Sequence, residues 1–241
     1  MTGFIDIHCH ILPGLDDGAK DRGMMEEMLK AAYNSGTRTM LATSHYNPDI
    51  FLYSLPEYEQ RLMLADIIAS DISEDFVIKS GNEVFYTSSS VDDMLAGKIK
   101  TLADSQYVLV EFAPYQDFSY ILKAVRDVTR AGFCPVIAHV ERYENILEHP
   151  EQTDRLIDAG AYIQVNASHV LGAGGKKVKN VVHRLFKKGN VHFVASDAHN
   201  MSSRSPQIHR CAEYICEKYG EAMCRKVMIE NPGKIISESI V

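Results

Sequence analysis

The chain has 241 residues, of which 46% are hydrophobic and 24% charged, so its composition is that of a folded globular protein, and we expect residues 1–241 to form one domain. It contains no uncharged apolar run of about eighteen residues, and residues 1–3 lack the basic and apolar regions of a signal peptide, which predicts a cytoplasmic protein without membrane insertion. A net charge of −7 argues against a nucleic-acid partner, and five irregularly spaced cysteines argue against a disulfide framework.

Strand-like and helical segments alternate in the first half of the chain. Residues 4–8 predict a strand, because apolar and polar residues alternate there, whereas the Pro, Gly and Asp content of residues 11–18 predicts a loop. Asp21 is a suitable N-cap for a helix over residues 22–35, with Gly36 as its stop. Similar patterns predict strands over residues 40–45, 76–84 and 107–112, and helices over residues 55–70 and 118–131.

The second half of the chain continues this alternation. A repeated strand-helix-strand order favours parallel pairing, and strands that are apolar throughout favour burial of both sheet faces. We therefore expect an α/β fold, a distorted TIM-like (β/α)7 barrel with its active site at the carboxyl ends of the strands, and keep a doubly wound open sheet as the alternative. The remaining strands are predicted over residues 135–139 and 161–166, and residues 192–199 are predicted to be the seventh strand together with its exit. The remaining helices are predicted over residues 151–159, 176–188, 206–219 and 221–230.

Side chains that bind metals recur at the carboxyl ends of the predicted strands. A single histidine or carboxylate in such a position is more often an exposed loop residue. In a parallel barrel, however, these ends all lie on one face, so residues far apart in the sequence converge there. Asp17, in the loop after the first strand, can reach the same face. We expect a shared metal site formed by His8, His10, Asp17, His45, Glu83, Glu111, His139, Asp197 and His199.

This donor set combines imidazole and carboxylate groups and contains no cysteine. Such sites bind Mn, Fe or Zn and keep room for water, whereas structural zinc sites normally use thiolates. Covalent catalysis by a cysteine in a phosphate-binding Cys-x5-Arg loop is not expected, because no cysteine here has an arginine six positions later. Among the other histidines, His169 follows the sixth predicted strand and is expected at the mouth of the site.

The signature Asp6-x-His8-x-His10, together with the other expected ligands, resembles the PHP superfamily, named for its polymerase and histidinol phosphatase members. The resemblance extends from residue 4 to about residue 235. In detail, the chain is similar to the bacterial manganese-dependent protein-tyrosine phosphatases encoded with capsule and exopolysaccharide proteins. Asp17 stands where many other PHP proteins carry a histidine, which favours this phosphatase branch. The segments that carry the resemblance are residues 4–18, 43–45, 81–83, 139–143, 166–168 and 196–199.

The resemblance implies three divalent ions, with Mn²⁺ expected and Fe or Zn as alternatives. The first would bind His8, His10, Glu83 and Asp197, the second Asp17, His45 and His199, and the third Glu83, Glu111 and His139. A hydroxide bridging two ions would attack phosphorus. We expect Asp197 and His199 to take part in catalysis, and Arg142 and Arg204 to donate to the phosphoryl oxygens. For each arginine a surface salt bridge is the alternative.

The resemblance therefore implies a metal-dependent protein-tyrosine phosphatase. Its expected substrate is phosphotyrosine in the tail of a cytoplasmic bacterial tyrosine kinase that regulates capsule or exopolysaccharide synthesis. The alternatives are a small-molecule phosphoesterase such as a histidinol phosphatase, a metal-dependent nuclease, and a regulatory module without activity. The acidic composition weighs against the nuclease, and the apparently complete ligand set weighs against the inactive module. The sequence gives no prediction of oligomeric state.

Overall fold

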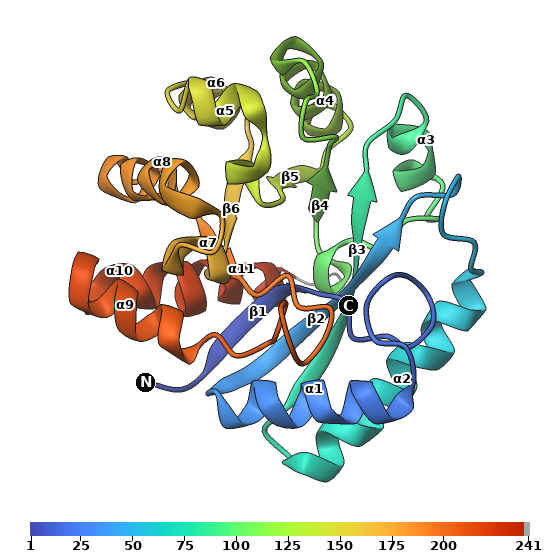
Figure 1. Cartoon of the computed structure of the whole chain (residues 1–241). Coiled ribbons are helices and arrows are strands. Elements are labelled where there is room, and N and C mark those ends of the chain that lie inside the picture. Colours follow the sequence, from blue (N-terminus) through green and yellow to red (C-terminus); the bar gives the residue numbers. More distant parts are fainter. Residues whose placement is uncertain (239–241) are drawn as a thin grey trace.

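Seven parallel strands form a nearly closed barrel (Figure 1). The structure is a computed structural model and describes residues 1–238. Each strand pairs with the next one in chain order, and a parallel bridge from Cys9 to Ala198 brings the end of β1 beside the segment that follows β7. The predicted distorted TIM-like (β/α)7 barrel is confirmed, and the alternative prediction of a doubly wound open sheet is wrong. The strands are β1 (Phe4–Cys9), β2 (Thr37–Tyr46), β3 (Val77–Phe85), β4 (Tyr107–Glu111), β5 (Cys134–Ile137), β6 (Tyr162–Asn166) and β7 (Phe193–Ala195).

Helices surround the strands on the outside of the barrel (Figure 1). No helix in the described part of the chain has the length and apolarity that crossing a bilayer requires. The α-helices are α1 (Arg22–Asn34), α2 (Leu55–Ile72), α3 (Ser90–Leu95), α4 (Phe118–Arg130), α5 (Glu144–Glu148), α6 (Gln152–Asp158), α7 (Ala167–Leu171), α8 (Gly175–Lys188), α9 (His209–Tyr219), α10 (Glu221–Arg225) and α11 (Asn231–Ser237), and the other helical turns are η1 (Leu102–Asp104), η2 (Val140–Arg142) and the π-helix η3 (Lys226–Glu230).

Local sequence signals start and stop the first two helices. The predicted cap of α1 is confirmed, because the Asp21 carboxylate accepts a hydrogen bond from the Met24 N–H at 2.9 Å. Helix α1 ends before Gly36, whose φ of +95° a residue with a Cβ rarely adopts. Helix α2 begins with a capping box, in which Ser54 and Glu57 each bond the other's backbone N–H. These caps satisfy N–H groups that have no partner inside the helix.

Apolar side chains fill the barrel interior below the strand ends. Ile7, Leu41, Leu109, Val136 and Phe193 belong to one buried cluster, although they come from five different strands. Strands that are not neighbours in the sheet can share such a cluster only across the interior of the barrel. The packed interior fixes the relative positions of the strands, and so of the polar side chains at their carboxyl ends.

The structure differs from the predicted elements mainly in the last third of the chain. Within residues 192–199, predicted as a strand with its exit, the strand β7 ends at Ala195, and Asp197 in the exit adopts a left-handed φ of +53° that a strand does not accommodate. The helix predicted from residue 206 begins at His209, and the segment predicted as one helix over residues 221–230 changes to a π-helix at Lys226. The short helices α3, α5 and α7 were not predicted, since so few residues carry little periodic signal.

Removing the Tyr58 hydroxyl is expected to destabilise the barrel. Tyr58 is 1% exposed, and its hydroxyl donates to the Ala42 carbonyl at 2.9 Å and accepts from the Gly81 N–H at 2.9 Å, which ties α2 to β2 and β3. Tyr58→Phe leaves both backbone groups without this partner, so we expect the free energy of unfolding to fall by about 1–3 kcal/mol. Urea denaturation measures it. Tyr115→Phe, at a side chain that is 78% exposed, is the control, and equal stability of the two variants would contradict the prediction.

Candidate metal centre

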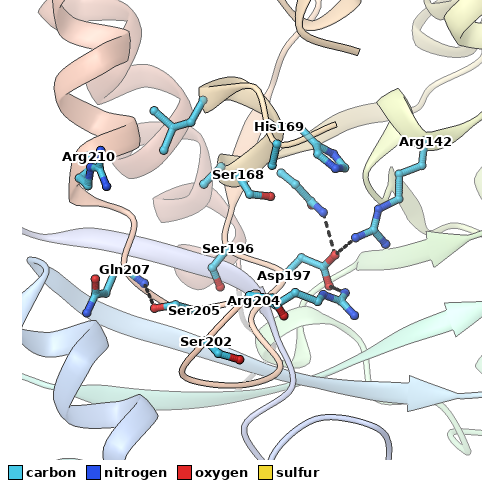
Figure 2. Close-up of a pocket in the computed structure, with 15 residues that line it drawn as sticks. Arg142, Ser168, His169, Ser196, Asp197, Ser202, Arg204, Ser205, Gln207 and Arg210 are labelled. Atoms are coloured by element: carbon cyan, nitrogen blue, oxygen red, sulfur yellow. Dashed lines mark hydrogen bonds and ion pairs between the residues drawn. The ribbon is translucent and has the colours of Figure 1, made fainter. Parts of the chain in front are cut away.

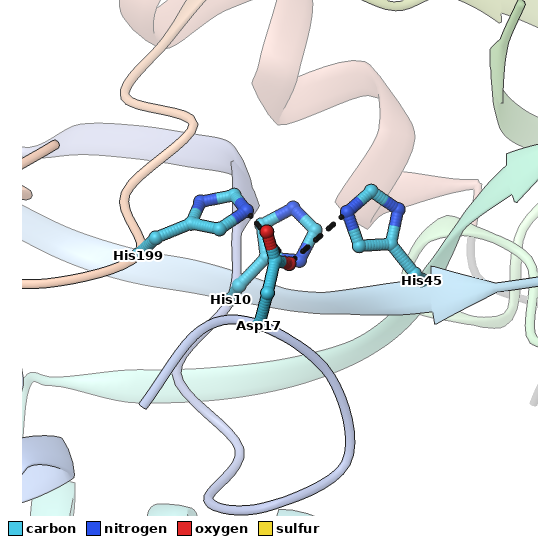
Figure 3. Close-up of side chains that lie close together, drawn as sticks. All are labelled: His10, Asp17, His45 and His199. Carbon is cyan, nitrogen blue, oxygen red and sulfur yellow. Dashed lines mark ion pairs between the residues drawn. The ribbon is translucent and has the colours of Figure 1, made fainter. Parts of the chain in front are cut away.

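The polar strand ends meet in a single buried cluster on one face of the barrel. Paired residues of neighbouring parallel strands point the same way, and the register pairs His45 of β2 with Glu83 of β3. Figure 3 shows His10, Asp17, His45 and His199 directed toward one another from the ends of β1 and β2 and from the loops after β1 and β7. Residues nearly two hundred positions apart are therefore brought together, as the strand-end pattern predicts.

The first group contains the four residues expected to bind the first ion: His8, His10, Glu83 and Asp197. All four are almost completely buried. Oε2 of Glu83 lies 3.1 Å from Nε2 of His8 and 3.2 Å from Nε2 of His10, and these two nitrogens lie 3.2 Å apart. Oδ1 of Asp197 lies 3.3 Å from Nε2 of His8. Two nitrogens and two carboxylate oxygens therefore converge on one point.

The second group contains Asp17, His45 and His199, as expected, and also includes His10. Oδ1 of Asp17 lies 3.4 Å from Nε2 of His45 and 3.3 Å from Nε2 of His199, the two contacts drawn in Figure 3. The rings of His10 and His199 are in contact, with centroids 3.8 Å apart. His10 thus lies between the first and second groups.

The third group differs in part from the expected set of Glu83, Glu111 and His139. Donor atoms of Glu83, Glu111 and His45 lie close together, with Nδ1 of His45 2.9 Å from Oε1 of Glu111. His139 still contacts both carboxylates, at 2.8 Å from Oε1 of Glu83 and 3.6 Å from Oε2 of Glu111. His45 belongs to two groups because its two ring nitrogens face opposite carboxylates.

The contact distances fit ligands arranged around divalent cations. Two ligand atoms bound at about 2.1 Å lie about 3.0 Å apart at right angles and about 3.4 Å apart in a tetrahedron, the range observed between His8, His10 and Glu83. Nδ1 of His45 and Nε2 of His199 are buried and have no aligned hydrogen-bond partner in the described part of the chain. Buried nitrogens of this kind normally bond a partner, and a metal ion is a suitable one.

The cluster combines carboxylates that stay ionised with neighbouring imidazoles, an arrangement that favours cations. Close contacts with the imidazoles of His199 and His45 hold the pKa of Asp17 far below its usual range. Burial disfavours charge on His10, but the Asp16 carboxylate outweighs this effect and raises the His10 pKa to about 9. Burial also opposes ionisation of Glu83, yet the surrounding histidines lower its pKa well below the ordinary value. Carboxylates that stay ionised beside imidazoles attract positive charge, whether a proton or a metal ion.

A second layer of buried polar groups orients the histidines. Asp16 accepts from Nδ1 of His10 at 2.8 Å and from the backbone N–H of His45 at 2.9 Å. On the other side, Oε1 of Gln164 lies 3.2 Å from Nδ1 of His8 and accepts the His139 N–H at 2.7 Å. Metal-binding histidines generally use their second nitrogen in this way. Sequence reasoning did not identify Asp16 or Gln164, although the position of Asp16 beside Asp17 in the loop was a usable signal.

Two of the expected ligands have a left-handed backbone. His139 has a φ of +32° and Asp197 a φ of +53°, values that residues with a Cβ adopt at a cost of about 1–3 kcal/mol. Their N–H groups are held by Gln164 Oε1 at 2.7 Å and by the His8 carbonyl at 2.8 Å, respectively. The surrounding barrel thus fixes a strained conformation that aims both side chains into the cluster.

Arg142 and Arg204 both reach the cluster through Asp197. Their guanidinium groups lie 2.7 Å from Oδ2 and 2.6 Å from Oδ1 of that carboxylate, as Figure 2 shows. Both side chains are about one-third exposed, at 34% and 32%. They line a pocket of about 400 Å³, here called the arginine pocket, whose wall also includes Asn166, His169, Asp197 and Arg210. Each arginine forms a salt bridge, but with a buried carboxylate of the cluster rather than with a surface residue, and its role toward phosphate stays a prediction.

The family is decided by comparison with known proteins. A family model described as "Capsular polysaccharide synthesis, CpsB/CapC" matches residues 4–237. This chain belongs to the CpsB/CapC family. The predicted resemblance to the capsule-associated phosphatases is thereby confirmed.

Named members of the CpsB/CapC family match the chain over nearly its full length. The tyrosine-protein phosphatase CpsB of Streptococcus pneumoniae is 33% identical over 98% of this chain and 100% of its own. The tyrosine-protein phosphatase YwqE of Bacillus subtilis (strain 168) is 34% identical over 98% of this chain and 93% of its own. A crystal structure from work on YwqE and CpsB, described there as metal-dependent tyrosine phosphatases, superposes with a TM-score of 0.90 at 30% identity, covering 98% of this chain and 96% of the other.

Proposed function

We propose that this chain is a metal-dependent protein-tyrosine phosphatase that acts on phosphotyrosine in a protein of capsule or exopolysaccharide synthesis. The observation that carries the proposal is the joint arrangement of buried imidazole and carboxylate donors with Arg142 and Arg204 at the edge of an open pocket. Family membership supports the substrate, because relatives covered over 93% to 100% of their length are named tyrosine-protein phosphatases.

We propose three divalent ions, with Mn²⁺ first and Fe or Zn as alternatives. His8, His10, Glu83 and Asp197 would hold the first ion. Asp17, His45 and His199 would hold the second, and Glu83, Glu111 and His139 the third, with His10 and His45 near enough to be shared. When bound, such ions supply a nucleophile from water near neutral pH and offset the negative charge of the phosphoryl group.

The net charge of the loaded site favours a phosphate dianion. Three dications contribute about +6, while Asp17, Glu83, Glu111 and Asp197 contribute about −4. Arg142 and Arg204 add positive charge on the pocket side. An acidic protein can thus bind an anionic substrate in this one place. The charge of the bound cations also explains how a site with four carboxylates can bind phosphate.

The residues of the chain then bind and orient the substrate. Arg142 and Arg204 are expected to donate to phosphoryl oxygens, since a planar guanidinium offers several N–H groups and only part of each is used by Asp197. Nε of Arg204 is buried and has no hydrogen-bond partner among the described residues. Asp197 holds both arginines in place while facing the histidines, so it connects phosphate binding to the metal cluster.

The proposed partner is the phosphotyrosine-bearing tail of a bacterial tyrosine kinase, and the phosphatase would then act in the cytoplasm. A tyrosine phenolate is a better leaving group than an alkoxide, because its parent pKa is near 10, so hydrolysis of an aryl phosphate needs less protonation of the leaving oxygen than hydrolysis of an alkyl phosphate. No cysteine of the described chain forms a disulfide, and none is followed by the arginine that a cysteine phosphatase requires.

Chelation and a substrate panel test this function. Metal content is measured first, and turnover is then measured with Mn²⁺ and with EDTA on four substrates: a phosphotyrosine peptide, the matching phosphoserine peptide, histidinol phosphate and single-stranded DNA. We expect hydrolysis of the phosphotyrosine peptide to fall at least about 100-fold on chelation and to exceed that of the other substrates. Faster hydrolysis of histidinol phosphate or DNA would favour the small-molecule phosphoesterase or the nuclease, and absence of any turnover would favour the regulatory module.

A further inference from the structure

His169 forms a pair with a buried carboxylate on the wall of the arginine pocket. It lies on α7, directly after β6, and its side chain is 15% exposed. Nδ1 of His169 lies 2.7 Å from Oε1 of Glu141. Figure 2 shows His169 beside Ser168 in the pocket that Asp197 and Arg142 also line. A histidine with one nitrogen engaged in this way has its other nitrogen, Nε2, free for a ligand.

Glu141 is a fixed support for His169. It is 0% exposed, and Oε1 also accepts the Asn166 N–H at 2.8 Å at the start of α7. Oε2 is buried and has no hydrogen-bond partner in residues 1–238. Within those residues, His169 is the basic side chain that lies within ion-pair distance of Glu141. Burying a carboxylate is unfavourable unless it is paired and hydrogen-bonded, so the contacts with His169 and with the Asn166 N–H offset the burial of Glu141.

The position of the pair corresponds to the leaving-group side of the proposed reaction. Asp197 lies between the metal-binding cluster and the arginine pocket. It contacts His8 on the cluster side and Arg142 and Arg204 on the pocket side. A phosphoryl group that contacts the cluster and the arginines has its leaving oxygen on the far side, because displacement at phosphorus is in line. That side is the arginine pocket, which His169 lines.

We propose that His169 is the general acid of this phosphatase, that it protonates the phenolic oxygen of the departing tyrosine from Nε2, and that Glu141 is its positioning residue. The proposal rests on the function proposed above. A carboxylate at Nδ1 fixes the tautomer and orientation of a histidine that transfers a proton at the other nitrogen. The His169–Glu141 pair supplies that arrangement at the mouth of the site.

The proposed step balances as follows in atoms and electrons. The bond between phosphorus and the phenolic oxygen breaks, and its electron pair stays on that oxygen. The proton of His169 Nε2 moves to the same oxygen, so tyrosine leaves as a neutral phenol. The oxygen of a water molecule forms the new bond to phosphorus, one proton of that water is released to solvent, and the product is inorganic phosphate. His169 regains a proton from solvent before the next turnover.

A purely structural role for the pair predicts a different dependence on the substrate. If Glu141 and His169 only anchor α7, loss of either side chain lowers the turnover of all aryl phosphates equally. Loss of a general acid instead slows substrates with a poor leaving group more than those with a good one. Turnover of two versions of one peptide distinguishes these cases. One version carries phosphotyrosine, and the other carries its ring-fluorinated analogue, which has a more acidic phenol and nearly the same size.

The test compares both peptides with His169→Asn and Glu141→Gln. Asparagine keeps a donor near the position of Nδ1 and removes Nε2, so the contact with Glu141 is preserved. For His169→Asn we expect kcat on phosphotyrosine to fall about 100-fold and kcat on the fluorinated peptide to fall less than about 10-fold. For Glu141→Gln we expect smaller decreases in kcat, again larger on phosphotyrosine than on the fluorinated peptide. His149→Asn is the matched control, since His149 forms an exposed pair with Glu151.

The outcomes separate this inference from the proposed function. If the unmodified protein hydrolyses neither peptide, the phosphatase function itself fails. If it hydrolyses both and the variants lose activity equally on both peptides, or lose none, the general-acid role of His169 is overturned. Circular dichroism and metal content confirm that the variants are folded and loaded. Should His169→Asn not fold, the leaving-group dependence of Glu141→Gln decides the question in the same way.

Discussion

Replacing Glu83 by glutamine is expected to lower phosphotyrosine hydrolysis by at least about 1,000-fold while the protein stays folded. Oε2 of Glu83 lies within 3.3 Å of His8, His10 and His45, and Oε1 lies 2.8 Å from His139. Glutamine has the same size but only one carbonyl oxygen and no charge, so it cannot bridge two ions. We therefore expect the metal content to fall together with activity.

The measurements are kcat/KM on a phosphotyrosine peptide, bound metal per chain, and the urea midpoint. Glu74→Gln, at an exposed position, is the matched control and should match the unmodified protein in all three. His199→Ala is expected to remove turnover as well, because His199 contacts Asp17 at 3.3 Å in the second group. Near-full activity of Glu83→Gln with normal metal content would show that the proposed ligand assignment is wrong.

Replacing Arg142 by alanine is expected to lower kcat/KM about 100- to 1,000-fold without loss of metal. Arg142 contacts Asp197 from the pocket side, and Asp197 keeps its contacts with Arg204 and Asn166 in the variant. The cluster should therefore remain intact while one donor to the phosphoryl oxygens disappears. This combination of low activity and normal metal content distinguishes Arg142 from Glu83.

Arg142→Lys gives a sharper test of what the guanidinium contributes. Lysine restores the positive charge but not two parallel N–H donors, so we expect it to recover only part of the lost kcat/KM. Arg184→Ala is the control, since Arg184 is 62% exposed and pairs with Glu151 at the surface. Unchanged kinetics of Arg142→Ala would remove Arg142 from the substrate-binding residues and leave Arg204 as the expected donor.

Much of the fold follows from local sequence patterns. Alternation predicts a strand over residues 4–8, within one residue of β1, and a capping aspartate places the start of α1 at Arg22, because both signals depend on neighbours a few residues away. The residue at which β7 ends and its exit begins was not predicted, since the left-handed φ of Asp197 is imposed by contacts with β1 rather than by neighbours in sequence. Short helices such as α7 have too few residues for a periodic signal.

The candidate site divides in the same way. Histidines and carboxylates at strand ends could be identified from the chain alone, because parallel strands of a barrel all end on one face, and the motifs of a known family supported that reading. The sequence could not predict which ring nitrogen of each histidine faces which carboxylate. His45 faces Asp17 with one nitrogen and Glu111 with the other, which depends on ring orientation inside the closed barrel.

The sequence by itself determined the strands and the longer helices, which side chains end the strands, and which family the chain resembles. The tertiary structure decided the partners behind those side chains: Asp16 behind His10, Gln164 behind His8, and Glu141 behind His169. The physical reason is the sequence distance over which each kind of interaction acts. Periodicity and capping act over one or two turns of chain, whereas these contacts depend on strand register and barrel closure, which the packing of the whole chain fixes.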